Sequence, residues 1–180
     1  MGKLIVISGA SGVGKGTVLK ELMALSPDFS FSVSATTRPP RPGEVDGREY
    51  YFVTREQFVR MIQDNAFLEY DDHAKNYYGT PRLQMEQKRE RGNVLLDIEP
   101  NGAKAVKAAE PEAVLIFIMP PSLEELERRL RGRGDTPEDQ IQLRMDRAKW
   151  EMAQSAWYDH VVLNDDPRRC AREILEIVSN

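Results

Sequence analysis

The stretch "ISGASGVGKGT", from Ile7 to Thr17, decides how the rest of the sequence is interpreted. Gly9, Gly14 and Lys15 fit the phosphate-loop pattern G-x-x-x-x-G-K, but Gly16 stands where that pattern carries Ser or Thr. In such a loop the backbone N–H groups point inward, and the following helix adds its unsatisfied amides and the positive end of its dipole. Lys15 adds a full charge that reaches the outer phosphates. The loop therefore predicts a nucleoside triphosphate site.

Apolar runs and helical periodicities surround this loop and continue along the chain. Leu4-Ile5-Val6-Ile7 predicts a strand buried on both faces, and apolar residues at helical spacing follow the loop. Further buried strands are predicted at Val94 to Leu96, Val114 to Met119 and Val161 to Leu163. Helical patterns lie near Leu123 to Leu130, near Ile141 to Met152 and after Pro167. Strands that alternate with helices predict an α/β fold with a parallel sheet and helices on both faces.

Length and composition limit the possible partners. The 180 residues suit one domain, and 41% hydrophobic with 30% charged residues indicate a globular chain. The net charge of −4 argues against nucleic acid or an anionic membrane, so an anion site must be a local concentration of Arg and Lys. The single Cys170 is expected to be inert and suits a reducing compartment. Because no apolar run approaches the roughly 20 residues of a membrane span and no signal-peptide pattern follows Met1, we expect a cytoplasmic enzyme.

The segment from about 34 to 91 interrupts the alternation of strands and helices. It is rich in Arg, Tyr, Pro and Gly, and we expect it to be partly β, with a helix near Glu56 to Gln63. Arg38 and Arg41 lie on a stretch stiffened by prolines, which lowers the entropy lost in holding two guanidinium groups ready for an anion. Arginine suits bidentate phosphate recognition, although this stretch alone fits a solvated basic loop equally well. With the loop at Gly9 to Thr17, the arginine pair favours two phosphate sites.

"SATTRPPRPGEVDGREYYFV", from Ser34 to Val53, resembles the signature segment of guanylate kinases. The resemblance covers nearly the whole chain. Besides the phosphate loop, it includes "FLEY" (67–70), "NYYGT" (76–80), "LDIE" (96–99), "PPSLEEL" (120–126), "RGRG" (131–134) and "LND" (163–165). It implies a P-loop kinase three-layer fold with a central parallel sheet, a mixed α/β GMP-binding insertion and a small lid. The core would span about 1–33, 92–127 and 145–180, the insertion about 34–91 and the lid about 128–144.

The resemblance also implies an activity and its partners. Guanylate kinases move the γ-phosphoryl group of ATP to GMP, giving ADP and GDP, so the chain is expected to bind ATP and GMP, to accept dGMP and to act in guanine nucleotide metabolism. The sequence is compatible with a homo-oligomer and does not define one. Two alternatives remain open: a sugar-bisphosphate kinase on the same frame, and a scaffold module that binds phosphorylated partners. The guanine-reading residues argue against the first, and Lys15 with the lid arginines argues against the second.

The site residues follow from the loop and from the resemblance. ATP would be bound by Gly9, Ala10, Ser11, Gly12, Val13, Gly14, Lys15, Gly16, Thr17, Arg133 and Asn164. GMP would be bound by Ser34, Arg38, Arg41, Tyr50, Glu69, Tyr78, Thr80 and Glu99. The residues expected to act in the transfer step are Lys15, Arg38, Asp97, Arg129, Arg133 and Arg144. Glu69, Thr80 and Glu99 would read the guanine ring, because carboxylates accept from its N1–H and amine and a hydroxyl donates to its O6.

Several of these residues have plain alternative roles. Mg²⁺ would be supported by Thr17 and, through water, by Asp97, yet Thr17 could cap the helix start and Asp97 could cap a turn at the end of its strand. Asn164 matches an adenine-contacting position, yet it could be the N-cap of the last helix. Glu99 stands where many relatives of this family carry Asp. Pro100-Asn101 follows it, in place of the Val-Gln type of sequence typical of the family.

Overall fold

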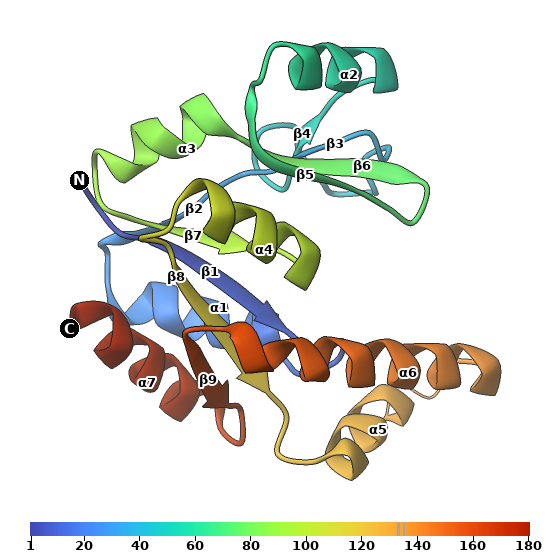
Figure 1. Ribbon diagram of the computed structural model, residues 1–180. Helices are drawn as coiled ribbons and strands as arrows, with labels where there is room; N and C mark the ends of the chain where they lie inside the picture. Colours follow the sequence, from blue (N-terminus) through green and yellow to red (C-terminus); the bar gives the residue numbers. More distant parts are fainter. Residues whose placement is uncertain (133, 135) are drawn as a thin grey trace. The chain divides into compact units, whose positions relative to one another are not determined.

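The computed structural model of the chain describes residues 1–132, 134 and 136–180 (Figure 1). Its strands are β1 (Leu4–Gly9), β2 (Phe29–Phe31), β3 (Ala35–Thr36), β4 (Tyr51–Phe52), β5 (Phe67–His73), β6 (Asn76–Pro81), β7 (Asn93–Asp97), β8 (Val114–Met119) and β9 (His160–Leu163). Its α-helices are α1 (Lys15–Leu25), α2 (Arg55–Gln63), α3 (Arg82–Arg89), α4 (Pro100–Ala109), α5 (Leu123–Arg131), α6 (Glu138–Gln154) and α7 (Pro167–Ser179), with a 3₁₀ turn, η1, at Ser155–Trp157.

Five strands form a sheet in the order β2-β7-β1-β8-β9, and its pairs β2–β7, β1–β8 and β8–β9 are all parallel. Every residue of β1 is buried, as are the four central residues of β8, so these strands read as unbroken apolar runs rather than alternating ones. The predicted α/β fold with a central parallel sheet is therefore confirmed. The chain folds as two compact units, Met1–Leu4 with Asp28–Asp97 and Asn101–Ala113, and Ile5–Pro27 with Ile98–Pro100 and Val114–Asn180.

The second of these units contains β1, β8 and β9 with helices α1, α5, α6 and α7. Its helices α5 and α7 begin at side chains that satisfy orphan backbone donors: Ser122 accepts from the Glu125 amide at α5, and Asp166 accepts from the Arg169 amide at α7. Pro167 occupies the first turn of α7, where its missing N–H costs nothing. Cys170 is buried in α7.

The first unit carries a second, four-stranded sheet in the order β4-β3-β6-β5, in which β5 and β6 form an antiparallel hairpin. Its α2 helix begins with a capping box between Thr54 and Gln57. A small aromatic core holds α2 on this sheet, because the Phe58 ring stacks on Phe67 at 4.4 Å and on Tyr77 at 5.0 Å between centroids. The expectation of a partly β segment with a helix near Glu56 to Gln63 is confirmed, and the same segment contains a second helix, α3, that was not predicted.

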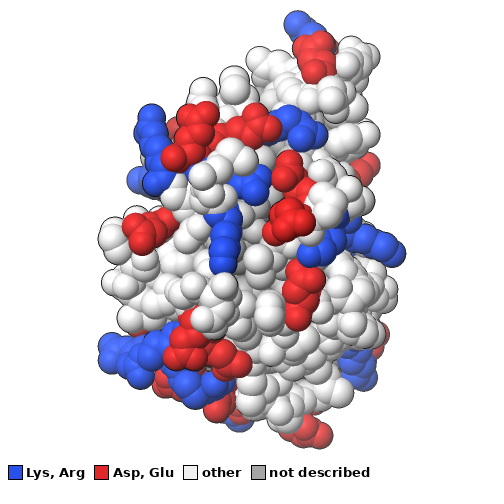
Figure 2. All heavy atoms as spheres, turned by 60° about the vertical axis from the view of Figure 1, so that its left-hand side comes forward, with Lys and Arg blue, Asp and Glu red and all other residues white. Residues whose placement is uncertain are grey.

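The surface carries paired charges of both signs. Figure 2 shows positive and negative side chains interspersed over the face that it presents. Arg169 of α7, for example, pairs with Asp165, which precedes the helix, and with Glu173 within it. None of the described helices is both long enough and apolar enough to cross a membrane.

Candidate active site

The phosphate loop connects the carboxyl end of β1 to the first turn of α1, as its sequence predicts. Gly12 and Gly14 have φ angles of 82° and 88°, in the left-handed region that favours glycine. A Cβ at position 12 would also approach the Leu130 Cδ2 to 2.7 Å. The Val13 amide donates to the Ala10 carbonyl at 3.0 Å, which closes the loop on itself. The loop is therefore a folded turn that ends at a helix N-terminus, the arrangement that binds anions.

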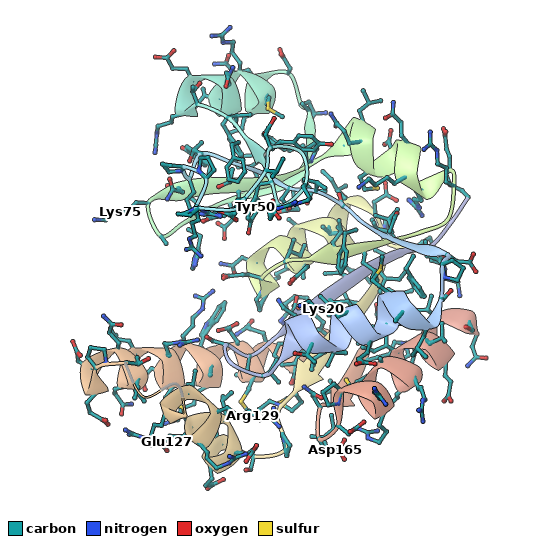
Figure 3. All side chains as sticks on the ribbon, turned by 180° about the vertical axis from the view of Figure 1, so that it is seen from behind. Lys20, Tyr50, Lys75, Glu127, Arg129 and Asp165 are labelled. Atoms are coloured by element: carbon teal, nitrogen blue, oxygen red, sulfur yellow. The ribbon has the colours of Figure 1, made fainter. Side chains whose placement is uncertain are left out.

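Two residues from distant parts of the chain hold this loop from outside. The Val13 carbonyl accepts from the Asn164 Nδ2 at 2.8 Å and from the Arg129 Nη1 at 3.0 Å. Asn164 is buried, and Arg129 projects from α5 (Figure 3). Asp166, rather than Asn164, is the N-cap of α7, so the capping alternative for Asn164 is wrong. The structure thus brings Asn164 and Arg129 to the phosphate loop.

The other residues predicted to bind ATP differ in whether the structure brings them to the phosphate loop. Arg144, on α6, has its Nη2 3.5 Å from the Ser11 Oγ of the loop. Thr17 is an exposed residue within α1, whose N-cap is Gly14, so the capping alternative for Thr17 is wrong. A Cβ at Gly16 would have nothing within 4 Å, so this departure from the motif is sterically neutral. Arg133 lies outside the described residues.

Arg38 of the predicted GMP side is held by Glu44. The Arg38 Nη1 and Nη2 donate to the two Glu44 oxygens at 2.8 and 3.0 Å, and the Arg41 amide donates to the same carboxylate at 2.7 Å. The Arg38 guanidinium lies 5.3 Å from the centroid of the Tyr50 ring, whose edge contacts Tyr78. The bidentate bond from Arg38 lowers the pKa of Glu44 to about 2. Three predicted phosphate-binding side chains, Arg38, Tyr50 and Tyr78, are therefore clustered, and Glu44 links Arg41 to them.

Tyr50 and Ser34 are fixed by their surroundings. Tyr50, labelled in Figure 3, directly precedes β4 in the chain. Burial raises the pKa of its hydroxyl, and the charges of Tyr78 and Asp97 add to this rise. Asp97 ends β7 and is exposed, so its carboxylate acts on this tyrosine from the strand end. The Ser34 carbonyl accepts from the Tyr51 amide at 2.8 Å, which anchors the start of the arginine segment to β4.

Glu69 and Thr80 form the most buried polar pair of the predicted site. They face each other across the β5–β6 hairpin, and the Thr80 Oγ1 donates to the Glu69 Oε1 at 2.6 Å. Glu69 is 7% exposed and Thr80 is 0% exposed. Burial raises the pKa of Glu69, while the bond from Thr80 opposes that rise. A buried carboxylate is suited to a ligand that offers hydrogen-bond donors, whereas the single O–H of Thr80 is donated to Glu69, which leaves the hydroxyl oxygen as an acceptor.

Glu99 follows β7, and its carboxylate contacts α6. Its Oε2 accepts from the Nη2 of Arg147, on α6. Arg147 also reaches Glu151, four residues further along the same helix, with Nε 3.4 Å from a Glu151 oxygen. Among the described residues, no group of three or more His, Cys, Asp or Glu side chains is arranged to hold a metal ion.

Three charged residues that contact predicted residues or their neighbours were not predicted from the sequence: Glu44, Arg147 and Glu151. Glu44 lies within the quoted arginine segment, where an acid three residues after Arg41 was a usable signal. Arg147 and Glu151 lie among many charged residues of α6, and helical charges at this spacing usually indicate a solvated face. Burial of Glu151 is a tertiary property that its local sequence does not carry.

A phosphate loop on a parallel sheet, with arginines from two helices converging on it and a separate arginine and tyrosine cluster, defines an α/β protein of the phosphate-binding nucleotide kinase class. The sequence profile described as "Guanylate kinase" matches residues 1–180. The chain belongs to the guanylate kinase family.

Individual relatives agree with this assignment. The chain is 49% identical to a guanylate kinase of Thermus thermophilus over 99% of its own length and 81% of the relative. It is also 49% identical to the guanylate kinase of Prochlorococcus marinus subsp. pastoris, over 99% of this chain and 97% of that one. The crystal structure of guanylate kinase from Anaplasma phagocytophilum aligns with a TM-score of 0.78 at 34% identity, covering 99% of this chain and 85% of that chain. The resemblance noted in the sequence is confirmed.

Proposed function

We infer that the protein transfers the γ-phosphoryl group of ATP to GMP, giving ADP and GDP. The observation that carries this inference is family membership over the whole chain, at 49% identity to the two guanylate kinases above. The phosphate loop supports the donor role of ATP, and the buried Glu69–Thr80 pair supports the choice of guanine. Adenine lacks the adjacent N–H donors of guanine, so a buried Glu69 would lose its partners with AMP.

The donor side is expected to act by position and charge. Lys15 and the loop amides would hold the β- and γ-phosphates of ATP, with Asn164 contacting the adenine. Arg129, Arg133 and Arg144 would neutralise the charge that develops on the transferring group. The contacts of Arg129 with the Val13 carbonyl and of Arg144 with Ser11 support this assignment.

The acceptor side is expected to orient the nucleophile, which is an oxygen of the GMP phosphate. Ser34, Arg38, Arg41, Tyr50 and Tyr78 would bind this phosphate, and Glu69, Thr80 and Glu99 would bind the base. The clustering of Arg38 with Tyr50 and Tyr78 supports the first set. Phosphoryl transfer then needs no covalent intermediate on the protein, because positioning and electrostatics supply the rate.

Magnesium is the cofactor that this chemistry implies. The candidate supports are Thr17, whose hydroxyl is exposed on α1, and Asp97, whose carboxylate is exposed at the end of β7. Hard oxygen donors of this kind suit Mg²⁺, which keeps several waters and binds substrate phosphates rather than a full protein cage. When bound, the ion would neutralise charge on the phosphate oxygens. We expect turnover to disappear on chelation of Mg²⁺ and to return when the ion is added back.

One coupled assay tests the proposed function. ADP release is measured with ATP and Mg²⁺ and with GMP, dGMP, AMP, UMP or ribose 5-phosphate as acceptor. We expect turnover with GMP, a measurable rate with dGMP, and rates with AMP and UMP lower by a factor on the order of 10⁴. Absence of turnover with GMP would contradict the proposal, and preference for a sugar phosphate would favour a different kinase.

A further inference from the structure

A single arginine on α6 joins two carboxylates that lie far apart in the sequence. The Arg147 guanidinium bonds to Glu99 through Nη2 and lies within ion-pair distance of Glu151 through Nε. Its plane is also restrained by the Trp150 ring, whose centroid is 4.6 Å from the guanidinium carbon. Arginine can make this bridge because its fork presents donors in two directions at once.

The Glu151 end of this bridge is the anchored end. Its side chain is only 7% exposed, whereas those of Arg147 and Glu99 are 37% and 41% exposed. Burial raises the pKa of Glu151, and the charge of Arg147 is the largest influence that opposes the rise. The Ser11 amide and the charge of Lys15, both at the phosphate loop, also lower this pKa. A buried carboxylate costs several kcal/mol unless it is paired, so Arg147 is held firmly in place by Glu151.

The Glu99 end of the bridge is the functional end. An exposed ion pair contributes little to stability, so the main effect of the Arg147–Glu99 contact is on where the Glu99 carboxylate lies. An ionised carboxylate has about four lone-pair sites, so Glu99 can accept from Arg147 and from a guanine donor together. The orientation of the Glu99 carboxylate plane then determines how well Glu99 accepts hydrogen bonds from the guanine base.

We propose that Arg147 is a positioning residue for guanine recognition, which fixes the Glu99 carboxylate while Glu151 fixes Arg147. This inference rests on the proposed function, in which Glu99 reads the guanine ring. It adds that the reading carboxylate is oriented by the same helix that carries Arg144 to the phosphate loop. The chain of contacts runs from Glu99 through Arg147 and Glu151 to the backbone of Ser11.

The test compares Arg147→Gln with wild type in steady-state kinetics. We expect the KM for GMP to rise about tenfold or more, the worth of one charge-assisted hydrogen bond, while kcat and the KM for ATP change much less. The reason is that a glutamine side chain at this position cannot hold Glu99 and Glu151 at once. Lys149→Gln, a loss of an exposed charge two residues away on the same helix, is the matched control and is expected to leave all constants unchanged.

A double-mutant cycle separates positioning from general damage. Glu99→Gln removes the reader, so adding Arg147→Gln to it should raise the KM for GMP no further. If the two effects instead multiply, or if Arg147→Gln alone leaves the KM for GMP unchanged, the inference is wrong.

A second variant covers the case in which Arg147→Gln does not fold. Arg147→Gln/Glu151→Gln removes the buried carboxylate together with its partner and is expected to fold, because no buried charge is then left unpaired. It should still show the raised KM for GMP, and a wild-type KM in this variant would overturn the inference. Failure of the proposed function would look different, because wild type itself would then show no turnover with GMP.

Discussion

The Arg38 guanidinium is held in place by hydrogen bonds to its neighbours. Three of its hydrogen bonds go to Glu44 and to the Pro39 carbonyl, and Glu44 takes two of them. Glu44 therefore orients the guanidinium without using all of its donors. It also accepts from the Arg41 amide, so one carboxylate sets both the side chain of Arg38 and the backbone that carries Arg41.

Replacing Arg38 tests the acceptor phosphate site. We expect Arg38→Met to lower kcat/KM for GMP by about 10²- to 10³-fold, because a charged donor aimed at the transferring phosphate is lost. The thermal midpoint should fall only modestly, since Arg38 lies outside the buried core and its loss removes one partly exposed ion pair, the pair with Glu44. Kinetics and circular dichroism measured on the same preparation check both statements. Near-normal turnover would remove Arg38 from the site.

Glu44 predicts a pH dependence of stability. Its pKa is lowered from 4.5 to about 2 in the folded protein, so its ionised form stabilises the fold above pH 4.5. This contribution is lost as the pH falls from 4.5 towards 2. The free energy of unfolding of wild type should therefore exceed that of Glu44→Gln at about pH 7, and the difference should shrink at about pH 3. Urea titrations at both pH values measure it, with the exposed Glu112→Gln as control.

At the scale of elements, the phosphate loop depends on two of its glycines in opposite ways. Alanine at position 12 would meet Leu130 of α5 and require a left-handed φ of 82°. Alanine at position 16 would meet nothing and would sit in the first turn of α1. The two substitutions add the same methyl group to the same loop, so they form a matched pair.

We expect Gly12→Ala to lower the free energy of unfolding by about 1–3 kcal/mol, from backbone strain and overpacking against α5. Gly16→Ala should raise it by up to about 0.5–1 kcal/mol, because alanine favours the helix. Urea denaturation of both variants at neutral pH gives the comparison. Equal stabilities would mean that the loop tolerates a displaced α5.

The elements that the sequence predicts are those with long apolar patterns. The buried runs of β1 and β8 and the stripe of α7 are visible without structure, because burial of a whole face leaves its period in the sequence. Strands β3 and β4 have two residues each and are too short to show any period. The β5–β6 hairpin turns at Ala74 and Lys75, both at positive φ, where no Asn-Gly or Asp-Gly signal marks the turn.

The site follows the same division. Residues inside contiguous motifs, such as the phosphate loop or the arginine segment, could be predicted because their chemistry and spacing lie together in the sequence. The bond from Asn164 to the Val13 carbonyl spans 151 residues, and only tertiary packing sets it. The bond between Thr80 and Glu69 was likewise absent from the prediction, although each was named as a guanine reader.

At the scale of the whole molecule, the predicted phosphate-loop residues and the residues predicted to bind the GMP phosphate belong to different compact units. The contacts within each unit are made mainly among its own residues, so a substitution in one site need not disturb the other. The two substrates should therefore be separable in binding experiments even though the reaction needs both.

Thermal shifts test this separation. A ligand at about 100 times its Kd stabilises the fold by about 2.7 kcal/mol, which is worth about 5–10 °C in a chain of this size. We expect Lys15→Ala to lose the shift caused by ADP and to keep the shift caused by GMP, and Arg38→Met to show the reverse. A variant that loses both shifts would show that the two sites depend on each other before any reaction.

The two donors on the Val13 carbonyl have a consequence for the opposite side of that peptide. A trans peptide is planar, with its C=O and the next N–H pointing in opposite directions. Because Asn164 and Arg129 fix the carbonyl of Val13, they also fix the direction of the Gly14 N–H. The peptide cannot flip without breaking both bonds, so the Gly14 N–H is already oriented before an anion binds. The direction of the Gly14 N–H does not depend on the side chain at position 16. Because Asn164 and Arg129 orient the loop through the Val13 carbonyl, the loop can carry glycine at that position.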